Sequence, residues 1–107
     1  MLLLGIDVGT SGCKTLLLDE AGTVIGSATE GYPLSHPRSG WYEQDPEDWW
    51  RAVCAATARV LAQTGAEPAS VGCIGLSAQM HGLVALDGQD RVLRPAILWN
   101  DLRSTMQ

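Results

Sequence analysis

The sequence predicts an α/β protein with a mixed sheet, in the order β-β-β-α-β-β. Three short apolar runs separated by glycine-containing turns come first, one stretch with helical periodicity follows, and a continuous apolar run comes next. Apolar residues make up 46% of the 107 residues and charged residues 18%, which is ordinary for a globular domain and excludes disorder as the main state. One helix covers only one face of such a sheet, so further helices would be needed for the other face.

The first three strands follow one another through tight turns. Residues 2–7 and 13–19 are apolar runs joined by the glycine-rich segment 8–12. Residues 23–30 form a third, partly alternating run after the turn at Ala21-Gly22. The pattern therefore predicts three consecutive strands linked by hairpins.

A loop and then the helix are expected next. Prolines and a glycine interrupt residues 31–44, which show no period and are predicted to be a loop. Asp45 suits the N-cap of a helix and Pro46 its first turn, while Gly65 suits the C-terminal end. One apolar face recurs at spacings of three and four, and it comprises Trp49, Val53, Ala56 and Val60. The predicted helix spans residues 46–63.

One longer strand and several short ones are expected after the helix. Residues 71–76 form a continuous apolar run, which is typical of a strand buried on both faces. A further hairpin is expected from residues 83–86 and 92–95 around the turn at Asp87-Gly88, followed by a last strand over residues 96–99.

The charge of the chain argues against two classes of partner. Twelve acidic and seven basic residues give a net charge of −5, and the basic residues are scattered, which is unlike a nucleic-acid-binding or membrane-surface protein. The apolar start, residues 1–4, lacks a basic flank and is interrupted by Gly5 and Asp7, so neither a signal peptide nor a membrane span is expected. The expected location is the cytoplasm. Cys13, Cys54 and Cys73 lack metal-site spacing, and reduced, mostly buried thiols are expected.

A candidate phosphate-binding loop lies between the first two strands. Gly9 lets the backbone approach a ligand closely, Thr10 and Ser11 offer hydroxyls and amide donors, and Lys14 offers a positive charge. Asp7 has the right sign for a Mg²⁺ that bridges phosphate oxygens through its waters. The spacing matches neither a Walker A loop nor a dinucleotide fingerprint, so a plain glycine-rich turn is an equally good interpretation from the residues alone.

A second candidate site follows the buried strand. Ligands of open α/β sheets gather at the carboxyl ends of strands, where Gln79, Met80 and His81 are expected. A histidine there can hydrogen-bond a hydroxyl group of a ligand. From the residues alone, the alternative in which Met80 fills the core and His81 bonds backbone is favoured.

A third group follows the last predicted strand. Trp99, Asn100 and Asp101 could line the same pocket from another strand end. A tryptophan is more often part of a core or an interface, so both interpretations of Trp99 stay open.

These clusters resemble motifs of a known family. Asp7-x-Gly9-Thr10-Ser11-x-x-Lys14 is similar to the first phosphate motif of the actin, Hsp70 and sugar-kinase superfamily. Residues 75–82, with 43–50 before them and 94–103 after them, resemble the amino-terminal region of xylulokinases, which belong to the FGGY carbohydrate kinases. The resemblance implies the ribonuclease H-like, actin-like ATPase fold, with residues 1–107 as the first part of the amino-terminal, sugar-binding domain.

The resemblance also implies an activity and its residues. ATP-dependent phosphorylation of D-xylulose to D-xylulose 5-phosphate is expected, with ATP and Mg²⁺ as cofactors. Asp7 would be the catalytic residue that helps hold Mg²⁺ through water. The phosphate-binding residues would be Gly9, Thr10, Ser11 and Lys14. The ketose-binding residues would be Gln79, Met80, His81, Trp99, Asn100 and Asp101. Members of the family are several times longer, so the general base and the nucleotide-binding domain are expected outside this chain.

Two other functions stay open. The chain could be a stand-alone, non-catalytic sugar-binding or regulatory module, or an actin-like ATPase element that binds no sugar. Stabilisation by ketose would distinguish the sugar-binding hypotheses from the ATPase hypothesis. A homodimer is left open, and the isolated chain is expected to be inactive, marginally stable and prone to associate.

Overall fold

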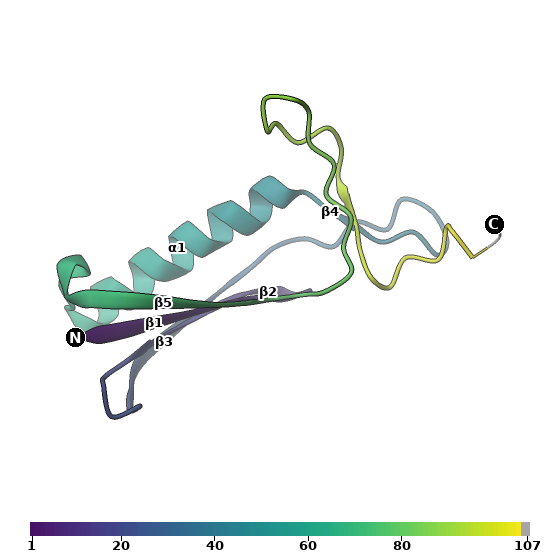
Figure 1. Ribbon diagram of the computed structural model, residues 1–107. Coiled ribbons are helices and arrows are strands. Elements are labelled where there is room, and N and C mark those ends of the chain that lie inside the picture. The colour runs from purple at the N-terminus through teal and green to yellow at the C-terminus, as the bar shows by residue number, and fades with distance from the viewer. Residues whose placement is uncertain (106–107) are drawn as a thin grey trace.

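A four-stranded sheet with one long helix on one face forms the body of the protein (Figure 1). The computed structural model describes residues 1–105. The strand order in the sheet is β3-β2-β1-β5. The bounds are β1 Leu2–Val8, β2 Gly12–Leu18, β3 Val24–Gly31 and β5 Val71–Ala78. β1, β2 and β3 are antiparallel neighbours, as the hairpins predict, whereas β5 runs parallel to β1. The predicted mixed sheet is confirmed.

The helix α1 spans Pro46–Thr64, one residue longer than the predicted range. Its start is fixed by Asp45, whose side chain accepts a 2.9 Å hydrogen bond from the backbone N–H of Glu47. Its end is fixed by Gly65, which adopts φ +69°, a left-handed conformation that costs glycine little. Both predicted ends of the helix are confirmed.

The core lies between α1 and the strands β2 and β3. Leu17, Ala56 and Val60 are fully buried there. Thr15 is the polar member of this core, and its hydroxyl donates to the carbonyl of Ala56 at 3.1 Å, so the buried oxygen is satisfied. The helix thus supplies the cover for the β2 and β3 side of the sheet.

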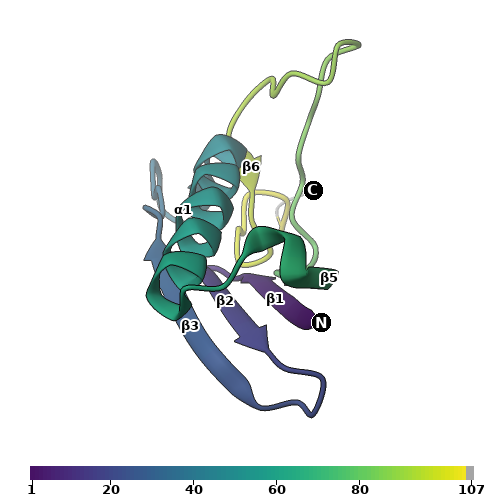
Figure 2. The ribbon, with the colours of Figure 1, turned by 90° about the vertical axis from the view of Figure 1, so that its left-hand side faces the viewer.

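The prediction that residues 71–76 are buried on both faces is wrong. β5 is exposed along most of its length, with Ile74 56% and Leu76 77% exposed. The physical reason is the position of α1, which packs over β2 and β3 and leaves β5 at the uncovered edge of the sheet (Figure 2). The apolar run therefore marks a surface that nothing within residues 1–105 covers.

A second, two-stranded sheet lies at the end of the first one. β4, Glu43–Gln44, pairs with β6, Ala96–Ile97. Sequence patterns missed β4, which falls in the predicted loop, and β6 is shorter than the predicted strand 96–99. A single-turn 3₁₀ helix, Pro68–Ser70, precedes β5.

The predicted hairpin of residues 83–86 and 92–95 is confirmed near its turn, but its two arms do not form regular strands. Within the described part of the chain this segment has one bridge across it, between Leu86 and Val92. The turn itself is confirmed, because the Asp87 carboxylate accepts from the backbone N–H groups of Gln89 and Arg91. The segment rises away from the sheet, where no neighbouring strand extends the pairing (Figure 1).

The cysteines differ from expectation in one respect. All three are free thiols, as predicted, but Cys13 alone is buried, whereas Cys54 and Cys73 are exposed. Both exposed thiols lie on elements whose outer surfaces have no cover, α1 and β5. Between residues 1 and 105, no helix is long and apolar enough to cross a membrane.

Candidate sugar-phosphate site

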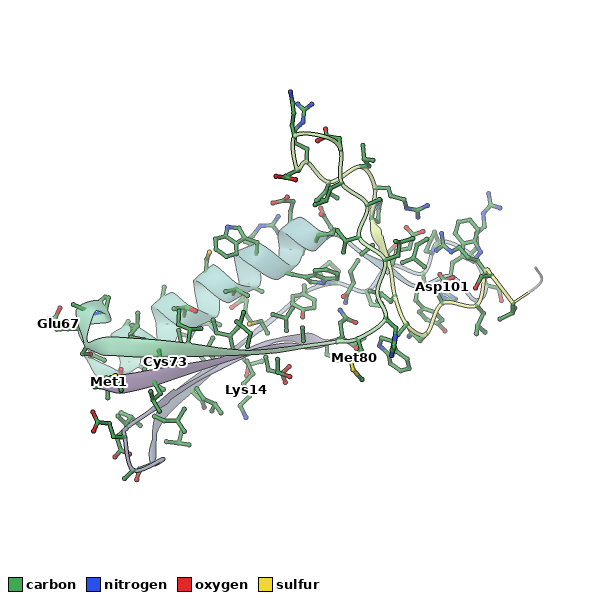
Figure 3. The ribbon with its side chains drawn as sticks, in the orientation of Figure 1. Met1, Lys14, Glu67, Cys73, Met80 and Asp101 are labelled. Atoms are coloured by element: carbon green, nitrogen blue, oxygen red, sulfur yellow. The ribbon has the colours of Figure 1, made fainter. Side chains whose placement is uncertain are left out.

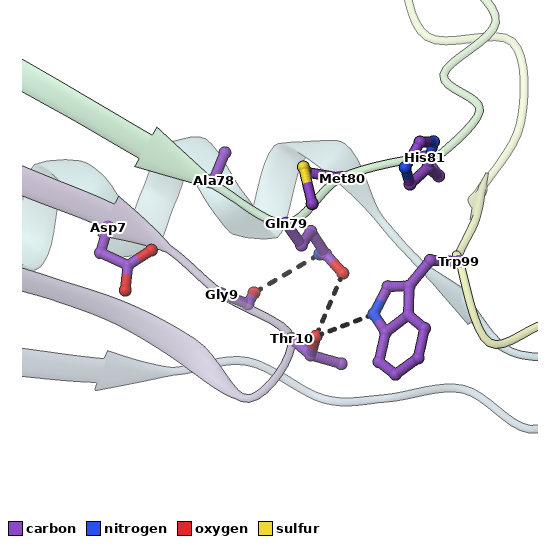
Figure 4. A pocket seen from close by; sticks show the side chains of 8 residues that line it. All are labelled: Asp7, Gly9, Thr10, Ala78, Gln79, Met80, His81 and Trp99. Carbon is purple, nitrogen blue, oxygen red and sulfur yellow. Dashed lines mark hydrogen bonds between the residues drawn. The ribbon is translucent and has the colours of Figure 1, made fainter.

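A hollow of about 370 Å³ lies where the carboxyl ends of β1 and β5 meet (Figure 4). The two strands are parallel neighbours whose register ends at Val8 opposite Ala78, so the segments that follow them emerge side by side. The hollow is lined by Ala78 and by seven residues predicted for the site, which are Asp7, Gly9, Thr10, Gln79, Met80, His81 and Trp99. The structure thus joins the phosphate candidates and the sugar candidates in one place.

The Asp7 carboxylate lies at the edge of this hollow. In the sheet Asp7 pairs with Lys14 on β2 and with Ser77 on β5. Alternation along the strands puts these three side chains on the face opposite α1, where Lys14 projects away from the helix (Figure 3). Asp7 is exposed and also lines an adjoining hollow together with Lys14. The Asp7 carboxylate has the charge that attracts Mg²⁺, and the Lys14 ammonium has the charge that attracts phosphate.

The turn between β1 and β2 is closed by a 3.0 Å hydrogen bond from Gly9 N to Gly12 O. Gly12 is required there because a Cβ atom would come within 2.6 Å of the carbonyl oxygen of Glu30. Thr10 and Ser11 form the tip of the turn. Ser11 is exposed but does not line the hollow.

The Thr10 hydroxyl joins the two sides of the hollow. It donates to Gln79 Oε1 at 3.3 Å and accepts from the indole N–H of Trp99 at 3.2 Å (Figure 4). The backbone N–H of Gln79 also donates to the carbonyl of Val8 at 2.8 Å. The hydroxyl of Thr10 is therefore occupied by protein groups, which leaves its backbone N–H as the group able to meet a phosphate.

The loop after Gln79 carries the two sugar candidates. Met80 is 71% exposed, so it does not fill the core. His81 is exposed and has φ +60°, a left-handed conformation that is uncommon for residues other than glycine. Asp90, in the exposed turn of residues 87–91, has a similar φ of +62°, so this conformation alone does not mark His81 as functional.

The structure places Asn100 and Asp101 outside the lining of the hollow. Asp101 accepts from Arg103 Nη2 at 2.7 Å and from the backbone N–H of Tyr42 at 2.7 Å. The side-chain hydrogen bond from Arg103 holds the pKa of Asp101 well below its usual range. Asn100 Oδ1 is buried without a hydrogen-bond partner in the described residues.

An ion-pair cluster fastens this segment to β4. Arg103 Nη2 lies 2.8 Å from Glu43 Oε1, and its guanidinium stacks 3.8 Å from the ring of Trp41. Arg94 Nη2 reaches the same oxygen of Glu43 at 2.8 Å. Glu43 is 6% exposed and is compensated by two cations, so the cluster anchors the segment that carries Trp99.

Two residues that sequence patterns missed support the turn from below. The Tyr32 hydroxyl donates to the carbonyl of Gly9, and Gln44 Nε2 donates to the carbonyl of Thr10 at 2.6 Å. Burial, with smaller contributions from the charges of Cys13 and Asp7, raises the pKa of Tyr32 to about 12, so this hydroxyl stays protonated. Both residues lie near the ends of the predicted loop, residues 31–44, which has no hydrophobic periodicity. Their positions in the sequence therefore do not indicate that they support the turn.

The donor set at the hollow fits a magnesium-bound polyphosphate. Within residues 1–105, no group of three or more His, Cys, Asp and Glu side chains forms a metal cluster. Mg²⁺ keeps several waters and takes one or two carboxylates together with phosphate oxygens. The single carboxylate of Asp7 beside free amide donors meets that requirement.

The mixed sheet with its parallel β5 and a hollow at the carboxyl ends of β1 and β5 is typical of α/β proteins that bind a ligand at this edge of the sheet. Residues 2–107 match the model of the FGGY family of carbohydrate kinases, N-terminal domain. The chain belongs to the FGGY family of carbohydrate kinases.

Individual relatives agree with this membership. Xylulose kinase of Escherichia coli is 46% identical over 106 residues, which are 99% of this chain and 22% of the relative. The crystal structure of a xyloylose kinase from Brucella ovis superposes with a TM-score of 0.93 at 49% identity, over 97% of this chain and 22% of that one. Gluconokinase of Bacillus subtilis is 40% identical over 102 residues, 95% of this chain and 20% of the relative. The chain thus spans about a fifth of the length of these relatives.

Proposed function

We propose that these residues belong to a xylulose kinase, which transfers the γ-phosphoryl group of ATP to D-xylulose and forms D-xylulose 5-phosphate. The observation that carries the proposal is that Asp7, the Gly9-Thr10 turn and the Met80-His81 pair all line the same hollow. The similarity to kinases named for xylulose supports the choice of sugar. The similarity to a gluconokinase makes gluconate the second candidate acceptor.

The phosphate side would act through charge and position. Bound Mg²⁺ would neutralise phosphate charge as it develops during transfer. We assign to Asp7 the holding of that ion through water, and to the amides of Thr10 and Ser11 the binding of phosphate oxygens. Lys14 shares a sheet face with Asp7 and would contribute its positive charge.

The sugar side would act through orientation. His81 would hydrogen-bond a hydroxyl of the ketose, and Met80 and the Trp99 ring would form an apolar surface for the carbon chain. Gln79 would set the position of this loop against Thr10. The sugar contacts of Asn100 and Asp101 stay predictions, and the Asp101 carboxylate pairs with Arg103, which also reaches Glu43.

The remaining roles are proposed to lie in the rest of the kinase. No residue of the hollow is assigned as the general base, and the adenosine site is placed in the second domain that the family implies. We place the enzyme in the cytoplasm, where ATP is supplied. The two alternatives of a regulatory module and an actin-like ATPase lack a comparable observation in their favour.

A comparison of three phosphoryl acceptors tests the proposal in the full-length kinase. D-xylulose, gluconate and glycerol are supplied with ATP and Mg²⁺, and kcat/KM is measured for each. D-xylulose should give the highest value. A higher value with gluconate would overturn the choice of sugar and keep the class of reaction.

Two variants test the assigned roles in the same protein. Asp7→Asn should lower kcat by about 100-fold or more with little change in sugar affinity, because its charge acts on the transferring group. His81→Ala should raise KM for D-xylulose by about 2- to 10-fold, the effect of one hydrogen bond to a neutral group. Asp90→Asn and His36→Ala, both at exposed positions, are the matched controls. Parental kcat in Asp7→Asn at saturating Mg²⁺ would contradict the assignment.

A further inference from the structure

Gln44 is a buried amide that lies behind the hollow and does not line it. It belongs to β4, is 2% exposed and makes three hydrogen bonds. Its Nε2 donates to the carbonyl of Thr10 at 2.6 Å, and its Oε1 accepts from Trp49 Nε1 at 2.9 Å and from Gln79 Nε2 at 3.0 Å. One side chain thus connects helix α1, the phosphate turn and the start of the sugar loop.

The orientation of this amide is dictated by its neighbour on the helix. The indole N–H of Trp49 can only donate, so the atom of Gln44 that faces it must be the carbonyl oxygen. The NH₂ group is then directed at the carbonyl of Thr10. The same oxygen of Gln44 receives the amide of Gln79, whose own oxygen is thereby turned toward the hydroxyl of Thr10. The donor and the acceptor of each hydrogen bond in this network are therefore assigned.

The peptide groups of the turn are oriented by these contacts. The carbonyl of Gly9 accepts from the Tyr32 hydroxyl and from Gln79 Nε2, and the carbonyl of Thr10 accepts from Gln44. All peptide bonds in the described chain are trans, so each carbonyl points opposite to the N–H of the next residue. The N–H groups of Thr10 and Ser11 therefore point away from the side chains that hold the carbonyls. Neither N–H meets an acceptor within residues 1–105.

We propose that Gln44 is a positioning residue for phosphoryl transfer. It holds the Thr10 carbonyl inward, and this directs the Ser11 amide outward at the exposed tip of the turn, where a phosphate oxygen can reach it. Through Gln79 it also fixes the distance between the turn and the loop that carries His81. The inference rests on the proposed transfer reaction at this hollow, and no contact between Gln44 and a substrate is required.

The test compares Gln44→Met with Gln63→Met in the full-length kinase. Methionine keeps the length of the side chain and removes both hydrogen-bonding groups, and Gln63 lies exposed near the end of α1. Gln44→Met should lower kcat about tenfold, since small misplacements of reacting groups cost that much or more. KM for D-xylulose should change by a smaller factor than kcat, because Gln79, at the start of the sugar loop, keeps its hydrogen bonds to Val8 and Thr10 when the bond to Gln44 is lost. Gln63→Met should match the parent.

A measurement without substrate separates this inference from the proposed function. Hydrogen–deuterium exchange of peptides covering residues 8–16 and 77–82 should be faster in Gln44→Met, with the core peptides of β3 and α1 unchanged. If the kinase does not phosphorylate D-xylulose, the exchange result still decides the role of Gln44, and kcat is read with the acceptor that the enzyme does use.

A purely structural role gives a different pattern. In that case Gln44→Met would lower the melting temperature, while kcat per folded molecule and exchange of the turn stay at the parental values, and the inference would be overturned. If Gln44→Met does not fold, Trp49→Phe takes its place, since it removes the donor that orients the amide and keeps an aromatic ring against the core. Trp49→Phe should then lower kcat about two- to threefold without raising KM for sugar.

Discussion

Two regions of the sheet meet at the hollow and are stabilised differently. One is the part formed by β2 and β3, which α1 covers, and the other is the edge strand β5. Under α1, residues such as Leu17, Ala56 and Val60 are fully buried and pack against one another. Along β5, Ile74 and Leu76 are exposed, and a groove of about 750 Å³ runs between β5 and α1. The first side can be stable on the residues described, whereas the second needs cover to remove its apolar surface from water.

The site lies on the border between these two regions. The turn at Gly9-Thr10 is attached to the covered side through Tyr32 and Gln44, and the loop at Gln79 follows the uncovered strand β5. The parallel pairing of β1 with β5 joins the two regions along the sheet. At the hollow itself, side-chain hydrogen bonds from Gln79 to Gly9 and to Gln44 connect the loop with the covered side. The difference teaches that the site depends on polar geometry and the core on packing.

The largest expected effect comes from leucine truncations on the two sides. Leu17→Ala should lower the free energy of unfolding by about 2–5 kcal/mol, because it removes a fully buried side chain. Leu76→Ala should change it by less than about 0.5 kcal/mol in the 107-residue chain, because the leucine is 77% exposed. Urea unfolding followed by circular dichroism measures both. Equal losses would mean that β5 is covered in solution, for example by self-association.

A glycine pair gives an intermediate effect. Gly12→Ala places a methyl group 2.6 Å from the backbone oxygen of Glu30, which should cost about 1–3 kcal/mol as β2 and β3 are forced apart. Gly75→Ala on β5 meets no atom within 4 Å and should be neutral or stabilising by up to about 1 kcal/mol. Thermal and urea unfolding of the two variants decide it. A neutral Gly12→Ala would show that the turn is looser than described.

The smallest effect concerns the hydroxyl under the phosphate turn. Tyr32→Phe should cost about 0.5–1.5 kcal/mol, the worth of its hydrogen bond to Gly9. The folded pKa of Tyr32, about 12, lies above the ordinary value of about 10. Its contribution is therefore complete below pH about 10 and is lost as the pH rises toward 12. The stability difference between parent and Tyr32→Phe, followed from neutral pH upward, should shrink in this window. A constant difference would contradict the assigned donor.

The sequence predicted the elements that depend on local signals. The helix ends follow from Asp45 and Gly65, and the first three strands follow from glycine turns between apolar runs. The burial of β5 was mispredicted because an apolar run indicates that a surface will be covered, without saying whether the covering element lies within these residues. Leu76 is 77% exposed, so no element within residues 1–105 covers this strand.

The candidate site could be predicted from the sequence only where motifs carry it. The resemblance selected Asp7, Thr10 and His81, and the parallel register of β1 and β5 brings them to one hollow. The supporting amide of Gln44 was not predicted, because its role depends on Thr10, which lies 34 positions before it in the chain, and on Gln79, which lies 35 positions after it. Long-range hydrogen bonds leave no periodic pattern in the sequence.

The two exposed cysteines provide built-in reporters for the two faces of the molecule. Cys54 lines the groove between α1 and β5. Cys73 precedes Ile74, a groove residue on the same strand, so alternation places its thiol on the opposite face. Cys13 is buried, and burial raises the pKa of its thiol, which keeps it from reacting. The rates of maleimide labelling at Cys54 and Cys73, read for each cysteine by peptide mass spectrometry, therefore compare how accessible the two faces of the sheet are in solution.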